Sequence, residues 1–209
     1  MNNILKKITA VLLSLLISML FISADTNEDV QEKYSAHILI EARTGAVLDE
    51  YNSDLQLNVG YMTKLMALLL IAEDIENGKY TTSTVITASQ AVAGTDGAVV
   101  WIEPNENITV DELLKAVIVG NANDAMTVLA EYSEQSVDNF VMRMNSEAFD
   151  LGLYSTTFYS PYGYYDEREH TTAHDLAIVC AKLSAYDALE PYFQIWRDFV
   201  RNGKAELVN

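Results

Sequence analysis

Four residues have the spacing of an acyl-transfer site, and two of them, Lys64 and Asn123, also have suitable side chains. Tyr61 precedes Lys64 by three positions, and Lys64 opens the apolar run Leu65–Ile71. Farther along, Asn121 and Asn123 flank a single alanine. Residues three apart in the first turn of a helix share a face, so an amine at position 64 can reach an oxygen carried by residue 61. The positive end of the helix dipole favours negative charge that develops there.

Acyl transfer needs a nucleophile, a base within hydrogen-bond reach, a proton route to the leaving amine and an oxyanion hole. Lys64 fits the role of the base. The alternative is that its side chain only snorkels from a buried helix to solvent. Tyr61 does not fit the nucleophile, because a phenol ionises near pH 10 and a carbonyl placed for a serine oxygen would collide with the ring. Asn121 carries an amide, which cannot relay a proton as a hydroxyl does.

A short hairpin and a buried helix are predicted around these residues. Residues 36–41 and 46–50 are β-type runs, and Gly45 in the segment between them favours a hairpin. Residues 62–76 are apolar on nearly every side, which indicates a buried helix, and Asn77-Gly78 ends it. We expect the hairpin to pack against this helix. A two-stranded hairpin is marginal alone, so it should belong to a larger antiparallel sheet whose other strands are not in this sequence, which leaves the helix partly uncovered.

The middle of the chain is predicted to be a mostly helical insert, from about residue 80 to 185. Thr87–Gln90 and Thr109–Glu112 both match the capping box, in which a Thr hydroxyl and an acid or amide three residues on satisfy free helix N–H groups. Further helices are predicted after Asn123, from Ser136 to Leu151, and from Thr172 to Lys182. The tyrosine-rich loop 159–165 is expected to pack between the insert and the sheet. The predicted fold class is therefore α+β.

The first residues have the pattern of an export signal. Two lysines precede an apolar run over residues 8–22, and small residues then lead to Asp25. Residues 1–24 are therefore predicted to be a signal peptide, which places the protein outside the cell or on the envelope face. The alternative is an uncleaved N-terminal anchor, although the run is shorter than the roughly 20 residues of a membrane span. Residues 25–209 are enough for one domain.

Charge and cysteine content exclude several classes of protein. The net charge is −17 and becomes −19 without residues 1–24, which argues against nucleic acid and against an anionic membrane surface as partners. Membrane contact is expected only through an uncleaved signal segment. Cys180 is the single cysteine, so no disulfide can form within the chain. Its apolar, helical setting predicts a buried and inert thiol.

The four residues also fall within a longer pattern that resembles a known family. A Ser-x-x-Lys turn, a Ser-x-Asn segment and a Lys-Thr-Gly strand form the active site of penicillin-binding proteins. The other matching segments are 40–48, Met62–Met66, Trp101–Pro104, Ile108–Ala116, Ala122–Ala125, Thr171–Ala177 and Arg201–Asn209. Over roughly residues 35–209 the chain resembles low-molecular-weight penicillin-binding proteins, specifically the serine-type D-alanyl-D-alanine carboxypeptidases of peptidoglycan metabolism.

The resemblance implies an incomplete β-lactamase/transpeptidase-like fold and a role for each site position. Lys64 would be the general base, and Asn123 the polar wall that orients base and substrate. Tyr61 stands at the nucleophile position and Asn121 at the proton-relay position, both with the wrong side chain. No Lys-Thr-Gly occurs in the sequence. Residues 25–209 are therefore expected to be a partial domain without the strand that binds the substrate carboxylate and supplies an oxyanion-hole N–H.

We therefore predict a catalytically inactive member of this family, with no cofactor, no metal, and weak or absent binding of peptidoglycan stem peptides. The alternatives are a non-catalytic pseudoenzyme that binds peptidoglycan or a partner, and a non-functional gene fragment. A zinc site is a further alternative, because His170 and His174 are four residues apart with acidic residues nearby. Against it, His170 precedes the predicted helix cap at Thr172, so the two histidines need not share a face.

Overall fold

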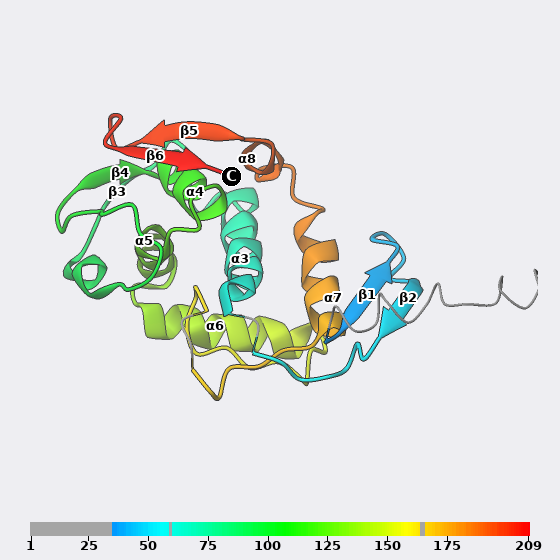
Figure 1. The fold of residues 1–209 in the computed structure, drawn as a ribbon. Helices are drawn as coiled ribbons and strands as arrows, with labels where there is room; N and C mark the ends of the chain where they lie inside the picture. Colours follow the sequence, from blue (N-terminus) through cyan, green and yellow to red (C-terminus); the bar gives the residue numbers. More distant parts are fainter. Residues whose placement is uncertain (1–34, 59, 164–165) are drawn as a thin grey trace, which may run out of the picture. The chain divides into compact units, whose positions relative to one another are not determined.

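The structure, a computed structural model, describes residues 35–58, 60–163 and 166–209 (Figure 1). Residues 36–209 form one unit of the chain. The predicted signal peptide, residues 1–24, lies outside the described residues. Within the described ranges, no helix is long and apolar enough to cross a membrane.

Short antiparallel hairpins alternate with helices along this unit. The strands are β1 (His37–Ile40), β2 (Val47–Tyr51), β3 (Val85–Thr87), β4 (Asn107–Thr109), β5 (Arg197–Val200) and β6 (Ala205–Val208). The helices are α3 (Lys64–Glu76), α4 (Val110–Ile118), α5 (Asn123–Glu134), α6 (Val137–Asp150), α7 (Ala173–Leu183) and α8 (Glu190–Phe193), with the 3₁₀ turns η1 (Gly60–Thr63) and η2 (Gln90–Gly94). Among the described residues these strands form three two-stranded sheets, β1–β2, β3–β4 and β5–β6.

The core is built around α3, which is surrounded by α5, α6 and α7 (Figure 1). No residue from Met66 to Ala72 is more than 4% exposed. A helix that is apolar on every side must be covered on every side, and here other helices do so. The expectation that α3 would be left partly uncovered by absent strands is therefore wrong for residues 66–72, whereas Leu65 is half-buried.

The N-terminal hairpin is confirmed, but its packing differs from the expectation. His37 lies opposite Tyr51, and the register shifts between Leu39 and Ile40. Strand β1 packs mainly against α7 rather than α3 (Figure 1). Helices already enclose α3, so α7 offers the apolar surface that remains. The hairpin is also poorly covered, with Leu39 57% and Leu48 64% exposed.

Side-chain caps set most of the predicted helix starts. Thr109 makes a complete capping box at α4, and the hydroxyls of Ser136 and Thr172 cap α6 and α7 as expected. The capping box predicted at Thr87 is wrong. Thr87 ends strand β3, which pairs with β4, and Ser89 instead caps η2 by accepting the backbone N–H of Ala91. Strand pairing therefore overrides the local helix signal at this position.

Two strand pairs were not anticipated, β3–β4 within the helical insert and β5–β6 after it. The β5–β6 hairpin packs on α4 and buries Val200 and Leu207. Its turn, residues 201–203, has positive φ throughout. Arg201 in this turn is buried and forms a two-pronged contact with Glu106 at 2.8 and 2.6 Å. This ion pair ties the hairpin to the loop that precedes β4.

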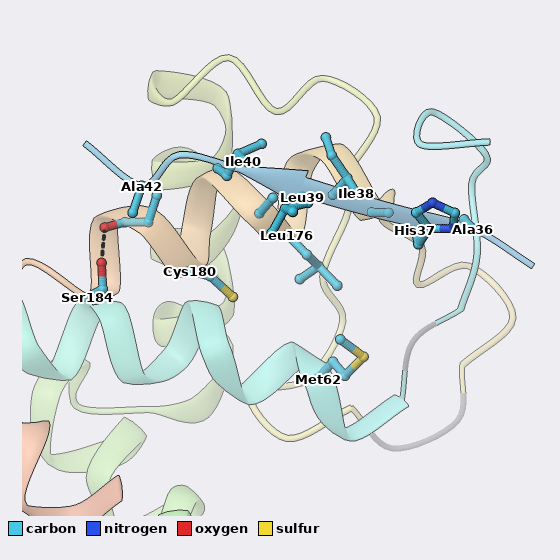
Figure 2. A pocket seen from close by; sticks show the side chains of 13 residues that line it. Ala36, His37, Ile38, Leu39, Ile40, Ala42, Met62, Leu176, Cys180 and Ser184 are labelled. Atoms are coloured by element: carbon cyan, nitrogen blue, oxygen red, sulfur yellow. Dashed lines mark hydrogen bonds between the residues drawn. The ribbon is translucent and has the colours of Figure 1, made fainter. Parts of the chain in front are cut away.

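The prediction of a buried thiol at Cys180 is also wrong. A hollow of about 520 Å³ opens between β1 and α7, and Cys180 lines it together with Leu39, Met62 and Leu176 (Figure 2). The cysteine is exposed, because the small β1–β2 hairpin leaves this face of α7 open. The neighbouring apolar side chains still exclude part of the solvent, and this partial burial raises the pKa of the thiol.

The exposure of Cys180 predicts that the native chain reacts with a maleimide. We expect one thiol to be labelled per folded chain at pH 8, more slowly than free cysteine because the raised pKa lowers the thiolate fraction. Intact mass measured over time, with the chain in denaturant as the reference, gives the comparison. Labelling that occurs only after unfolding would contradict the open hollow.

Candidate functional site

Lys64 and Asn123 meet at the centre of the unit, although 59 residues separate them in sequence. The Lys64 ammonium donates a hydrogen bond to Asn123 Oδ1 at 2.7 Å. Both side chains are buried, with Lys64 4% and Asn123 0% exposed. The juxtaposition expected from the sequence is therefore confirmed. It arises because each residue is the first of a core helix, α3 and α5 respectively.

Asn123 is held in one orientation by the loop in front of it. Its backbone N–H donates to the Ala98 carbonyl, and its Nδ2 donates to the Asp96 carbonyl, both at 2.7 Å. Once the amide nitrogen is committed to the loop, Oδ1 is the atom that faces Lys64. The side chain therefore acts as an oriented acceptor for the amine.

A second acceptor for Lys64 comes from the tyrosine-rich loop. The Tyr162 carbonyl accepts from the Lys64 ammonium at 3.2 Å. The backbone comes this close because Gly163 packs directly on Gly60: a Cβ on Gly163 would lie 1.7 Å from the Gly60 carbonyl oxygen. The sequence analysis missed this contact. Pro161 and Gly163 within the aromatic run marked a turn, but a carbonyl contact leaves no side-chain signature.

The other end of this loop is anchored beneath the start of α3. The hydroxyl of Thr63, fully buried, donates to the buried carboxylate of Glu169. Burial raises the pKa of Glu169, and the bond from Thr63 opposes that rise. Asn58 adds hydrogen bonds to the carbonyls of Asp166 and Glu169. These contacts hold the loop that carries the Tyr162 carbonyl, and none of them was foreseen from the sequence.

Tyr61 reaches across the site from η1. Its ring lies over the Lys64 ammonium, 4.5 Å from nitrogen to ring centroid. Its hydroxyl oxygen is 3.3 Å from the position that a Cβ on Gly97 would take. The side chain thus spans from the amine to the loop that orients Asn123. The face of the ring, rather than the hydroxyl, meets the amine.

Asn121 completes the set of four predicted positions. It lines a hollow of about 370 Å³ together with Tyr61 and Lys64, and the rest of the wall consists of Asn209 and apolar side chains such as Leu65 and Leu68. We call this space the Lys64 hollow. Asn121 has a φ of +53°, a left-handed conformation that asparagine adopts more readily than most residues. All four positions therefore lie around one site.

The electrostatics of the site favour a neutral amine. Burial lowers the pKa of Lys64 to about 7. Its two hydrogen-bond partners are an amide and a carbonyl, which carry no charge to hold the proton. Near neutral pH a large share of the amine is therefore unprotonated and able to accept a proton from a group placed beside it.

The histidines considered for zinc belong to different elements. His170 lies in an isolated bridge with Thr157, and its Nδ1 faces the Arg168 carbonyl. His174 lies in the first turn of α7 beside Asp175. Within the part of the chain that the structure describes, no three His, Cys, Asp or Glu side chains are grouped to hold a metal ion.

Comparison with known proteins places this arrangement in a family. The model of the D-alanyl-D-alanine carboxypeptidase family matches residues 23–200 of this chain. D-alanyl-D-alanine carboxypeptidase DacF of Bacillus subtilis is 36% identical over 176 residues, covering 84% of this chain and 45% of that protein. DacA of Escherichia coli K12 is 28% identical over 182 residues, covering 80% of this chain and 45% of that protein.

Solved structures agree. The carboxypeptidase DacD from Francisella tularensis matches with a TM-score of 0.75 and 28% identity, covering 83% of this chain and 42% of that one. Penicillin-binding protein 5 from Haemophilus influenzae matches with a TM-score of 0.76 and 26% identity, covering 83% and 51%. The chain thus spans about half the length of the proteins it matches, with a partial penicillin-binding-protein fold. It belongs to the D-alanyl-D-alanine carboxypeptidase family.

Proposed function

We propose that this chain is a catalytically inactive member of its family that acts in peptidoglycan metabolism by binding rather than by hydrolysis. The position of Tyr61 carries the proposal. Its ring covers the amine of Lys64 and reaches Gly97, so it occupies the space in which a serine oxygen and the carbonyl of a substrate would meet. Exported members of such a family meet their substrate outside the cell, and we place this chain there too.

Two side chains of the site support inactivity together. A phenol ionises near pH 10 and is a poor nucleophile at neutral pH. The amide of Asn121, on the wall of the Lys64 hollow, cannot pass a proton to a leaving amine. The base remains, with the pKa of Lys64 near 7, but it has no hydroxyl to activate.

Binding is supported by what the chain retains. Lys64 and Asn123 remain paired and buried, and carbonyls of the adjacent loops accept hydrogen bonds from both side chains. A hollow beside them keeps a volume that admits a small peptide terminus. We expect a polypeptide of these 209 residues to bind such a peptide weakly, because it contains no Lys-Thr-Gly that could hold the peptide carboxylate.

The first test is acylation by a β-lactam. After incubation of the chain with penicillin, intact-protein mass spectrometry should show only the unmodified mass, because position 61 offers no activated hydroxyl. A relative with an intact Ser-x-x-Lys turn serves as the positive control. An acyl adduct that maps to Tyr61 would falsify the inactive-site proposal.

A second test restores the hydroxyls. The Tyr61→Ser, Asn121→Ser double variant should still release no appreciable D-alanine from a D-Ala-D-Ala peptide. A polypeptide of these 209 residues contains no Lys-Thr-Gly to supply an oxyanion-hole N–H, and loss of one such donor alone costs about 10²–10³ in rate. Appending the Lys-Thr-Gly segment of a relative to the double variant should recover acylation by penicillin. Efficient cleavage by the unextended double variant would instead show that the substitution at position 61 alone is disabling.

A third test addresses the buried amine through stability. The pKa of Lys64 is about 7 in the folded chain and near 10.4 when unfolded. Above pH 7 the unfolded chain therefore binds more protons at this residue, so its contribution to the free energy of unfolding rises with pH. Between pH 7 and 9 the unaltered chain should gain roughly 1–2 kcal/mol relative to Lys64→Met.

Chemical denaturation of both proteins at the two pH values measures this difference. Lys204→Met, at an exposed position in the β5–β6 turn, is the matched control and should keep the pH dependence of the unaltered chain. Equal pH dependence for Lys64→Met and the unaltered chain would rule out a buried amine with a lowered pKa.

A further inference from the structure

Trp101 is held in an unusual conformation at the surface. Its side chain is 76% exposed, and its φ is +62°. A bulky residue in the left-handed region is strained, and such strain persists only where the surroundings impose it. Single exposed apolar residues are common, so the informative feature is what imposes this backbone.

Two buried charged side chains fix the backbone around Trp101. The carboxylate of Asp124, 1% exposed, accepts the N–H groups of Val100 and Ile102 at 3.1 and 2.9 Å. The guanidinium of Arg201 donates to the Val100 carbonyl at 2.8 Å. The side chains of Val100 and Ile102 are buried on either side. The peptide groups that flank Trp101 are therefore clamped, while its ring stays in solvent.

The same loop borders the site. Asn123, next to Asp124 on α5, donates hydrogen bonds to the carbonyls of Asp96 and Ala98. A Cβ on Gly97, which lies between those two residues, would be 3.3 Å from the hydroxyl of Tyr61. Trp101 follows Gly97 by four residues, so their Cα atoms are at most about 14 Å apart. One helix start thus orients both an acceptor for Lys64 and the exposed ring.

We propose that the exposed face of Trp101 binds an N-acetylated amino-sugar ring of the peptidoglycan glycan. The proposal rests on the proposed function for the choice of polymer. An indole held rigid offers a flat apolar face at little entropic cost, and the C–H face of a sugar ring is its complement. Glu103 and Asn105 are exposed and follow Trp101 closely in the sequence. The Glu103 carboxylate can accept hydrogen bonds from hydroxyl and acetamido N–H groups, and the Asn105 amide can both accept and donate them. A neutral sugar also suits a chain of net charge −17.

Fluorescence tests the proposal, because the chain has only two tryptophans. Trp196 is 74% exposed and serves as the matched control. Trp196→Phe leaves Trp101 as the only reporter, and titration with the N-acetylglucosamine tetramer should give a saturable blue shift. Trp101→Phe leaves Trp196 as the reporter and should give none. No shift from Trp101, or an equal shift from both reporters, would overturn the proposal.

Sedimentation with insoluble peptidoglycan gives an independent readout. Trp101→Ala should weaken binding about tenfold, whereas Trp196→Ala should leave it unchanged. A soluble stem peptide without sugar should bind Trp101→Ala and the unaltered chain equally. If the stem peptide fails to bind either protein, the proposed function of the hollow is wrong, while the tetramer titration still decides the sugar site. Equal sedimentation of the unaltered chain and Trp101→Ala would refute the role of Trp101. Circular dichroism confirms that each variant is folded.

Discussion

The enclosure of α3 on all sides constrains the rest of the structure. Because residues Met66–Ala72 are shielded by neighbouring helices, the first residue of the helix, Lys64, has to place its amine inside the protein. A buried amine needs acceptors and loses part of its proton affinity. The loop carbonyl of Tyr162 and the amide of Asn123 supply those acceptors, so the site geometry follows from covering one apolar helix.

The far end of α3 is secured by charge in addition to apolar contact. Asp74, 4% exposed, forms an ion pair with Arg143 of α6 at 2.8 Å, and Arg143 also reaches Glu134 of α5 at 2.9 Å. A hydroxyl from Ser133 donates to the same carboxylate. Shared buried partners of this kind lock the relative positions of three helices. Asn123, at the other end of α5, is thereby fixed against Lys64.

The substitutions at positions 61 and 121 leave this frame intact. Tyr61 finds room over the amine and against Gly97, which has no side chain to oppose it. Asn121 takes a left-handed turn conformation that its side chain tolerates. The frame is maintained by helix burial and loop hydrogen bonds, neither of which depends on a nucleophile. The proposed loss of catalysis is therefore compatible with retention of the fold.

Helix-capping residues and apolar runs in the sequence identified the helices whose formation depends on neighbouring residues. The hydroxyls of Thr109, Ser136 and Thr172 cap their own helices, and the apolar run after Lys64 requires burial wherever it lies. The pairing of Lys64 with Asn123 was also predictable, because motif order survives in the sequence. These features act over a few residues, or through side chains whose types are visible.

Tertiary structure decided the features that depend on which surfaces remain uncovered once the core helices have packed. Strand β1 packs on α7 because α3 is already covered, and the hollow beside Cys180 is the consequence. Thr87 lies in strand β3 because it pairs with Asn107 of β4, which comes 20 residues later in the sequence. The carbonyl of Tyr162 accepts a hydrogen bond from the Lys64 amine because Gly60 and Gly163 pack closely together. Every residue has a backbone carbonyl, so no sequence pattern marks the carbonyl that folding brings to the buried Lys64 amine.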